Sequence, residues 1–361
     1  MGSYQGHQKN QSLQFIAKSF ATGALFLGAL LSCSHQSSVP KNLKEAITMN
    51  PVAPALDVTA LGIQITKTGD NDSPFLSEDG KKVVYISRKR PSHKQGQVYL
   101  FDLERLKERR ITYQDGDCKD PVLTKDGQQV LYASSTDELK ERPLLFQKNV
   151  SPTSLPPTEI YSSDLAGSQI QRLTQREGFD GAPWPRYDRP ESFLYSIWNG
   201  KLFEVWQMNL QSHQQVKMLD RKDRSIESLR ISPDNKRSAW IERLPNGESQ
   251  IVVGPIKYQN GPERTLKLPV GEFKELNWLN DHQLVINAKL FNKKFQFYRF
   301  DLISDCIQNL FETNTDLYSP RPNSDGQGLV FVSVLNEKSD IFYKSLTTSD
   351  QCLKWEAKPV N

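Results

Sequence analysis

The sequence predicts an all-β chain that closes into a six-bladed β-propeller of four-stranded antiparallel blades. Three observations predict it. Turn signals recur at a nearly constant interval, short runs of alternating apolar residues flank each turn, and a further strand pattern follows each pair of runs. No long stretch of helical periodicity competes with them after residue 60. We expect the propeller to occupy residues 62–361.

Composition places the chain among globular proteins. Its 361 residues are 37% hydrophobic and 24% charged, which excludes a disordered chain and a polytopic membrane protein. Lys and Arg total 46 and Asp and Glu total 42, so the formal net charge is only +4. Because so small a charge creates no strong field, we exclude nucleic acid as a partner.

Residues 1–32 have the features of a bacterial secretory signal. They contain two lysines and no acidic residue, and an apolar run follows over residues 20–31. The run is too short for a transmembrane helix, which needs ~20 apolar residues. We therefore expect the chain to be exported and residues 1–32 to be removed as a signal peptide.

The apolar run ends in Leu30-Leu31-Ser32-Cys33, which resembles the lipobox of bacterial lipoproteins. By that resemblance Cys33 becomes the lipidated first residue, and acyl chains anchor the protein to a membrane. An ordinary cleaved signal with an incidental cysteine is the alternative. An inner-membrane retention signal would have Asp directly after the cysteine, but this chain has Ser34 there. We therefore expect the protein to be anchored in the periplasmic leaflet of the outer membrane. Residues 33–61 are predicted to be a flexible tether.

The repeat is about 46 residues long. The turn signals are spaced by 47, 62, 46, 46 and 45 residues, and they are Asp79-Gly80, Asp126-Gly127, Asp188-Arg189, Asp234-Asn235, Asn280-Asp281 and Asp325-Gly326. A bulky residue follows each turn by six positions, or by seven in the third repeat: Tyr85, Tyr132, Tyr195, Trp240, Ile286 and Phe331. The Asp-Gly pairs predict type I′ hairpin turns, since Gly accepts a positive φ. Each repeat therefore supplies a blade.

The segments Ser73–Tyr85, Ile231–Lys236 and Ser319-Pro320 with Asp325-Gly326 resemble the repeat of the TolB family of six-bladed propellers, a WD40-like (PD40) repeat. The resemblance covers residues 62 to about 357. It implies the fold and only weakly a function, because propellers carry many activities. The family has an α/β domain before the propeller, where we expect only a tether in this chain. TolB is soluble, whereas the lipobox-like segment predicts a lipidated protein here.

The spacing also predicts how the ring closes. Residues 62–67 repeat the pattern of an outer strand, so we expect the N-terminus to complete the last blade and remove an open edge; residues 352–356 are the competing candidate. Cys306 and Cys352 lie near equivalent points of neighbouring repeats. They either form a disulfide bond or remain as unpaired thiols. Cys118 is the third cysteine of the predicted propeller.

Acidic residues stand in every connection between blades. If these connections share one face, carboxylates form a collar around the channel mouth: Asp72, Asp117, Asp120, Asp180, Asp223, Glu227, Glu275 and Asp316. Such a collar would suit a cationic peptide end, an amine or a hard cation such as Ca²⁺; otherwise no cofactor is expected. Alternatively, these short acids accept backbone hydrogen bonds.

The second blade has an insertion of about 15 residues within residues 136–158, with Phe146 in an apolar segment at its tip. Long loops are often functional, so this loop is either a partner-contact element or a tolerated insertion. Trp198, next to Asn199-Gly200, is the tryptophan that we expect to be exposed.

Catalytic motifs are scarce. The sequence contains no GxSxG elbow, no P-loop and no Cys/His cluster for zinc. We therefore predict a non-catalytic periplasmic lipoprotein whose propeller binds a protein or peptide partner as an envelope scaffold. The alternatives are a propeller lyase or hydrolase that acts on oligosaccharide or peptide through channel carboxylates, and a purely structural lipoprotein.

Overall fold

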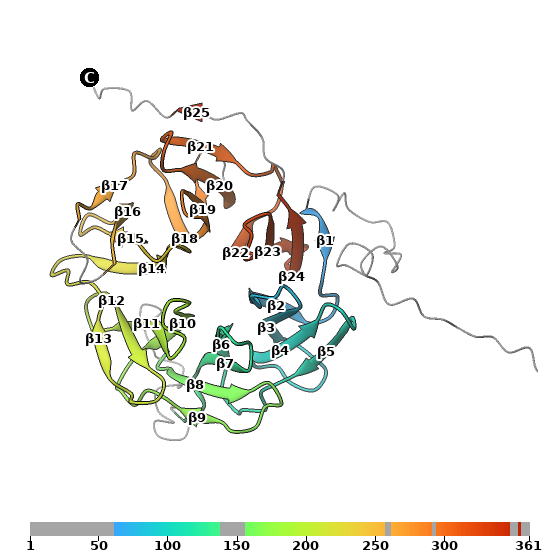
Figure 1. The fold of residues 1–361 in the computed structure, drawn as a ribbon. Helices are drawn as coiled ribbons and strands as arrows, with labels where there is room; N and C mark the ends of the chain where they lie inside the picture. The colour runs from blue at the N-terminus through green and yellow to red at the C-terminus, as the bar shows by residue number, and fades with distance from the viewer. Residues whose placement is uncertain (1–60, 138–155, 257–260, 291–293, 347–352, 355–361) are drawn as a thin grey trace, which may run out of the picture. The chain divides into compact units, whose positions relative to one another are not determined.

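The computed structural model describes residues 61–137, 156–256, 261–290, 294–346 and 353–354. All of them belong to the second of two units, Val39–Asn361. Their strands form six antiparallel sheets arranged as a ring about a central axis (Figure 1), and two cavities that first-strand residues line define the central channel. The prediction of an all-β, six-bladed propeller is confirmed. Within the described residues no helix is long and apolar enough to span a bilayer.

Each blade is built around consecutive strands, the first of which lies next to the channel; β1 and β25 join blades 6 and 5 from the two ends of the chain. Blade 1 contains β2 (Asp70–Leu76), β3 (Lys82–Arg88), β4 (Gln97–Asp102) and β5 (Lys107–Arg110). Blade 2 contains β6 (Cys118–Leu123), β7 (Gln129–Ser134), β8 (Glu159–Asp164) and β9 (Gln171–Arg172). Blade 3 contains β10 (Asp180–Pro185), β11 (Ser192–Trp198), β12 (Phe203–Asn209) and β13 (Gln215–Lys217).

The second half of the ring follows the same order. Blade 4 contains β14 (Ser225–Ile231), β15 (Arg237–Arg243), β16 (Ser249–Pro255) and β17 (Arg264–Thr265). Blade 5 contains β18 (Glu272–Asn280), β19 (Gln283–Lys289), β20 (Gln296–Asp301), β21 (Cys306–Asn309) and a fifth strand, β25 (Leu353–Lys354). Blade 6 contains β22 (Leu317–Pro322), β23 (Gly328–Leu335), β24 (Lys338–Ser345) and β1 (Ile63–Gln64).

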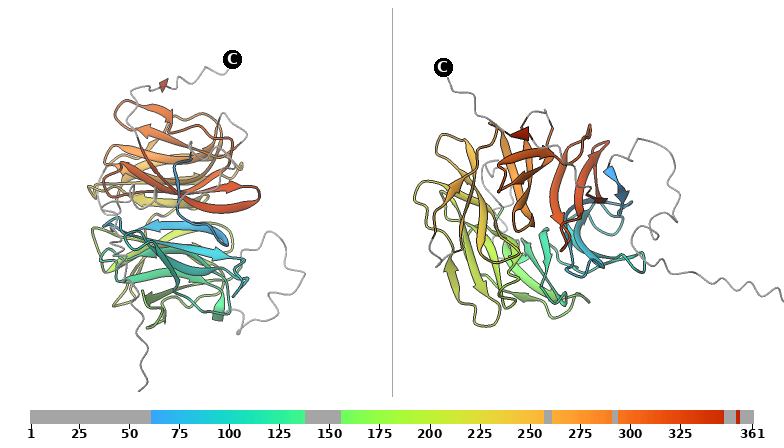
Figure 2. Two further views of the ribbon diagram at one scale, coloured as in Figure 1. Left: turned by 90° about the vertical axis from the view of Figure 1, so that its right-hand side faces the viewer. Right: turned by 45° about the horizontal axis from the view of Figure 1, so that its top comes forward.

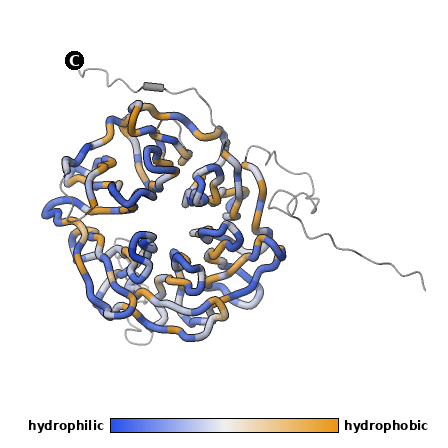
Figure 3. Tube along the Cα trace, in the orientation of Figure 1, coloured by the Kyte–Doolittle hydropathy of each residue, from blue (hydrophilic) through white to orange (hydrophobic). Residues whose placement is uncertain are grey.

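The hydrophobic core lies between neighbouring blades and is centred on their second strands. The bulky residue that follows each turn signal is almost completely buried, with exposed fractions of 0 or 1%: Tyr85, Tyr132, Tyr195, Trp240, Ile286 and Phe331. Hydrophobic residues are concentrated in the body of the blades, while the segments around the channel are mostly hydrophilic (Figure 3). The repeat thus supplies one large core side chain to each blade.

The turns between the first two strands of a blade differ from the predicted type I′ geometry. β2 ends at Leu76 and β3 begins at Lys82, so the loop is longer than two residues. In the Asp79-Gly80 pair only Gly80 has a positive φ, of +69°. The Asp79 side chain accepts a hydrogen bond from the backbone N–H of Lys81 (3.1 Å), which stabilises the wider loop.

The first strand of most blades contains a bulge at a residue with positive φ. These residues are Ser73, Asp120, Ala182, Ser228 and Ser319, with φ between 48° and 52°. The register shifts across each of them, and all but Ser228 precede a proline. Because a bulge bends a strand and re-aims its side chains, each first strand directs a residue just after the bulge towards the channel.

The N-terminus closes the ring, as predicted. Ile63 and Gln64 of β1 pair with Tyr343 and Phe342 of β24. Figure 2 shows β1 and β24 side by side from two further directions. Asp340 supports this junction from β24: it is 4% exposed and accepts hydrogen bonds from Gln64, Thr66 and Asn71, at 3.0 Å each.

The C-terminal segment, the other candidate for the outer strand of blade 6, lies in a different blade. Leu353 of β25 pairs with Ile307 of β21, so this segment extends blade 5 instead of completing blade 6. Cys306 in β21 is disulfide-bonded, which excludes the alternative of unpaired thiols for this residue. Its predicted partner, Cys352, lies outside the described residues, whereas Cys118 is free and buried.

Candidate binding site in the central channel

Six equivalent positions, one from each first strand, surround the channel at its middle. Each pairs with the residue just before the bulky core residue of the second strand: Phe75, Val122, Trp184, Arg230, Asn277 and Arg321. We call this set the channel ring. Two arginines and a tryptophan at equivalent positions distinguish it from an ordinary apolar packing layer.

Trp184 contacts both arginines of the channel ring. The guanidinium carbon of Arg230 is 3.7 Å from the centre of the indole ring, and that of Arg321 is 5.0 Å from it. Phe75 packs edge-on against the same indole, with ring centres 5.3 Å apart. Cation–π contacts of this kind hold the arginines against the aromatic face and restrict their rotamers.

One carboxylate serves both arginines. Glu275 accepts a hydrogen bond from Arg230 Nη2 (3.2 Å) and another from Arg321 Nη1. Asn277 Oδ1 accepts a bond from Arg230 Nε (3.1 Å). Burial lowers the pKa of Arg230 to about 10, and the positive charge of Arg321 acts in the same direction.

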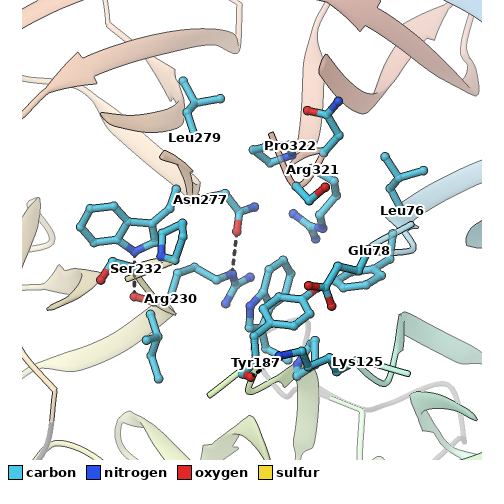
Figure 4. A pocket seen from close by; sticks show the side chains of 18 of the residues that line it. Leu76, Glu78, Lys125, Tyr187, Arg230, Ser232, Asn277, Leu279, Arg321 and Pro322 are labelled. Carbon is cyan, nitrogen blue, oxygen red and sulfur yellow. Dashed lines mark hydrogen bonds between the residues drawn. The ribbon is translucent and has the colours of Figure 1, made fainter. Parts of the chain in front are cut away.

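The channel ring separates two cavities that open on opposite sides of it. The hairpin-side cavity, of about 270 Å³, lies among the loops that join the first two strands of the blades (Figure 4). Its walls include Leu76, Tyr187, Trp278, Leu279 and Pro322. Trp184, Arg230 and Arg321 form the boundary that it shares with the second cavity.

The crossing-side cavity, of about 300 Å³, lies among the connections between blades. Of the eight predicted carboxylates, Asp120, Glu227 and Glu275 line it. Asp120 accepts a hydrogen bond from Ser73 Oγ (3.1 Å), and Glu227 forms an ion pair with Arg243 (2.7 Å). The lining carboxylates are therefore already engaged by the protein.

Two of the other predicted carboxylates join neighbouring blades. Asp117 accepts a hydrogen bond from the backbone N–H of Gly96 (2.6 Å), and Asp316 accepts the equivalent bond from Phe295 (2.8 Å). In each case the donor belongs to the preceding blade. These bonds agree with the alternative prediction that the acidic residues accept backbone hydrogen bonds. Neither Asp117 nor Asp316 lines either of the two cavities.

Asp72 and Asp223 also lie away from the cavity linings. Asp72 forms an ion pair with Arg88 of the adjacent strand. Asp223 is exposed and lies 3.4 Å from the guanidinium of Arg224, next to a surface depression on blade 4. Three of the eight predicted carboxylates thus line a common cavity, and the other five lie outside the two cavity linings, where most of them pair with local donors.

Asp180 is buried between blades 2 and 3. It is 1% exposed, and neither of its carboxylate oxygens has a hydrogen-bond partner among the described residues. The nearest ion-pair contact is Arg176, at 3.9 Å. Burial raises the pKa of Asp180 to about 7, with Arg176 opposing the shift and the negative charge of Glu159 adding to it.

Trp198, the predicted aromatic contact residue, lies on the same side of the channel ring as the crossing-side cavity. Trp198 is half-buried and packs against Phe203 with ring centres 4.9 Å apart; Phe203 and Phe179 line the cavity. Phe146 and most of the blade 2 insertion lie outside the described residues. The end of the insertion is held by Thr158, whose backbone N–H donates to Gly178 O (3.1 Å).

The sequence argument missed Trp184, Arg230 and Arg321. Aligning the repeats on the bulge would have found them, since each stands two positions after the residue with positive φ. Their importance still depends on their convergence in space. Within the part of the chain that the structure describes, no group of three or more His, Cys, Asp or Glu side chains could hold a metal ion.

A ring of six antiparallel blades, each with four strands and one extended by a fifth, defines a six-bladed β-propeller. TolB from Acinetobacter baumannii has this fold, with a TM-score of 0.54 at 18% identity over 71% of this chain and 58% of that chain. A putative TolB from Agrobacterium tumefaciens gives 0.55 at 12% identity, over 79% and 93% of the two chains. An oligogalacturonate lyase in complex with manganese gives 0.54 at 15% identity, over 79% and 80%.

These comparisons show the fold alone: the chain is a TolB-like six-bladed propeller in architecture. It spans 58% of the length of the Acinetobacter TolB chain. No protein-family model matches the chain, and no curated protein matches it in sequence.

Proposed function

We propose that the propeller binds a protein or peptide partner in the bacterial periplasm, with the hairpin-side cavity as the contact site. The observation that carries the proposal is the make-up of this cavity, which combines apolar walls with a few converging polar groups. Binding sites have this composition, because apolar walls supply affinity and a small number of polar groups fix orientation.

Tyr187 is the residue through which this site is best tested. It lines the cavity and is 38% exposed, so a partner seated there would cover it. We expect Tyr187→p-benzoylphenylalanine, irradiated in intact bacteria, to form one discrete protein adduct. Western blotting and mass spectrometry of the purified adduct provide the measurement.

Ile303 supplies the matched control. It is also a large exposed hydrophobic residue, 74% exposed, but it lies in the turn between β20 and β21, away from the channel. Ile303→p-benzoylphenylalanine should give no discrete adduct. Equal adducts at both positions, or none at Tyr187, would contradict partner binding at the hairpin-side cavity.

An enzyme acting on oligosaccharide or peptide remains the alternative function, since the fold also occurs in an oligogalacturonate lyase. Such an enzyme needs a group that is free to accept a proton. Three carboxylates line the crossing-side cavity: arginines hold Glu227 and Glu275, and Asp120 accepts a hydrogen bond from Ser73 (3.1 Å). This pairing favours binding over catalysis, and the proposal includes no cofactor.

We further propose that the protein is exported and anchored to the outer membrane by lipid on Cys33. The lipobox-like Leu30-Leu31-Ser32-Cys33 sequence supports this, although these residues lie outside the described part of the structure. The disulfide at Cys306 agrees with an oxidising compartment such as the periplasm.

Metabolic labelling tests the anchor. We expect the wild-type protein to incorporate labelled palmitate and to fractionate with outer membranes, and Cys33→Ala to lose both properties. Cys118→Ala, which changes a buried free cysteine, should keep them. Incorporation of label into Cys33→Ala would show that Cys33 is not the acylated residue.

A further inference from the structure

The side chains that line the hairpin-side cavity carry more positive than negative charge. The charged residues that line this cavity are Lys125, Arg230, Arg321 and Glu78, which makes three cations and one acid. Figure 4 shows the side chains of Arg230 and Arg321 pointing toward one another. Glu275, the carboxylate that they share, lines the crossing-side cavity instead.

A donor of this arginine pair is also unused. Arg321 Nε is buried and has no hydrogen-bond partner among the described residues, although the side chain bonds to Glu275 and to Pro320 O through Nη1. The side chain of Arg321 is only 11% exposed. Because an unpaired buried donor is costly, a ligand acceptor that this guanidinium can turn towards would stabilise the side chain.

From these two observations we propose that the arginine pair binds a carboxylate carried by the peptide partner. A carboxylate presents two oxygens to a guanidinium in a matched, bidentate geometry and supplies the missing negative charge. Trp184 holds both guanidiniums in place, and the walls formed by Leu76 and Leu279 lower the local dielectric. The inference rests on the proposed function and names the chemical group that the site recognises.

The carboxylate has two sources, the C-terminus of the partner or an Asp or Glu side chain. Three acetylated pentapeptides separate them: Ac-Ala-Ala-Ala-Ala-Phe with a free C-terminus, its C-terminal amide, and Ac-Ala-Ala-Glu-Ala-Phe amide. We expect isothermal titration calorimetry to detect binding of the free-acid peptide, the Glu peptide or both, and at least tenfold weaker binding of the neutral amide. Equal affinities for all three, no binding of any, or stronger binding of inorganic phosphate would overturn the inference.

Variants of Arg321 connect the binding to the residue. Arg321→Gln should weaken binding of the preferred acidic peptide at least tenfold, and Arg321→Lys, which keeps the charge without the fork, should weaken it less. Arg90→Gln is the matched control, since Arg90 also lies over an aromatic ring (Tyr99, 4.6 Å) and pairs with a glutamate (Glu108, 2.7 Å), but on the outer part of blade 1. If circular dichroism shows that Arg321→Gln does not fold, the affinity of Arg321→Lys for the acidic peptide alone tests the inference.

The cross-linking site separates failure of this inference from failure of the proposed function. With the cross-linker at residue 187, the Arg321→Lys background should lower the yield of the partner adduct at least threefold. An unchanged adduct would overturn carboxylate recognition and leave partner binding intact. Absence of the adduct in the wild-type background would instead remove the proposed function itself.

Discussion

Asp180→Asn is expected to raise the free energy of unfolding at pH 8 by about 2–4 kcal/mol. Asp180 is buried with neither oxygen hydrogen-bonded among the described residues, so its charged form is poorly stabilised in the folded protein. Thr174 is nearby, but its hydroxyl donates to Glu159 instead. An amide at this position removes the buried charge at almost constant volume.

The pH dependence follows from the raised pKa. Between the ordinary value of 3.8 and about 7, the folded protein retains the proton on Asp180 while the unfolded chain releases it. Folding is therefore linked to proton uptake, and this residue makes stability fall as pH rises through that window and level off above it. Arg176 lowers this pKa, whereas Glu159 raises it.

Urea titrations at pH 5, 6, 7 and 8 provide the measurement. The difference in unfolding free energy between Asp180→Asn and the wild type should grow with pH up to about pH 7. Asp126→Asn, in the exposed loop between β6 and β7, should show no such trend. A difference that is independent of pH would show that Asp180 is charged throughout the range.

The second large effect is expected at Glu275. Glu275→Gln should lower the free energy of unfolding by about 3–5 kcal/mol, because it leaves two buried guanidiniums without their common counter-charge. The side chains of Arg230 and Arg321 are 9% and 11% exposed, so solvent compensates little. Equilibrium unfolding in urea at pH 7 measures the loss.

Glu227→Gln is the control for this prediction. Glu227 lines the same crossing-side cavity, but its single arginine partner, Arg243, is 34% exposed. Solvent can replace the carboxylate there, so we expect a loss of about 1 kcal/mol or less. Equal losses for the two variants would show that Glu275 does not compensate a buried pair of charges.

The fold was predictable because its signals are local and repeated. A turn residue at each repeat and a bulky residue six positions later define a hairpin and its core side chain, as in Tyr85 and Phe331. The closing strand was predictable for the same reason, since residues 62–67 carry the outer-strand pattern without a preceding blade. The turn geometry was predicted wrongly: the loop is longer than a type I′ turn, because the side chains of Ser77 and Asp79 stabilise it.

The candidate site was much less predictable. Asp117 and Asp316 resemble channel acids in sequence, but backbone N–H groups of the preceding blade engage them first. Trp184, Arg230 and Arg321 belong to three different blades; the repeat places them at equivalent positions, but their residue types do not show that their side chains meet. Their significance comes from cation–π contacts and one shared carboxylate, which exist only after the ring has closed.

The junction between β1 and β24 has a consequence for biogenesis. Thr66 and Asp340 are hydrogen-bonded although 274 positions separate them in the chain. Contacts of such long range slow folding, because the entropy of bringing distant segments together opposes them until late. Blade 6 thus stays incomplete until almost the whole polypeptide has emerged from the ribosome, so the ring cannot close while the chain is still growing.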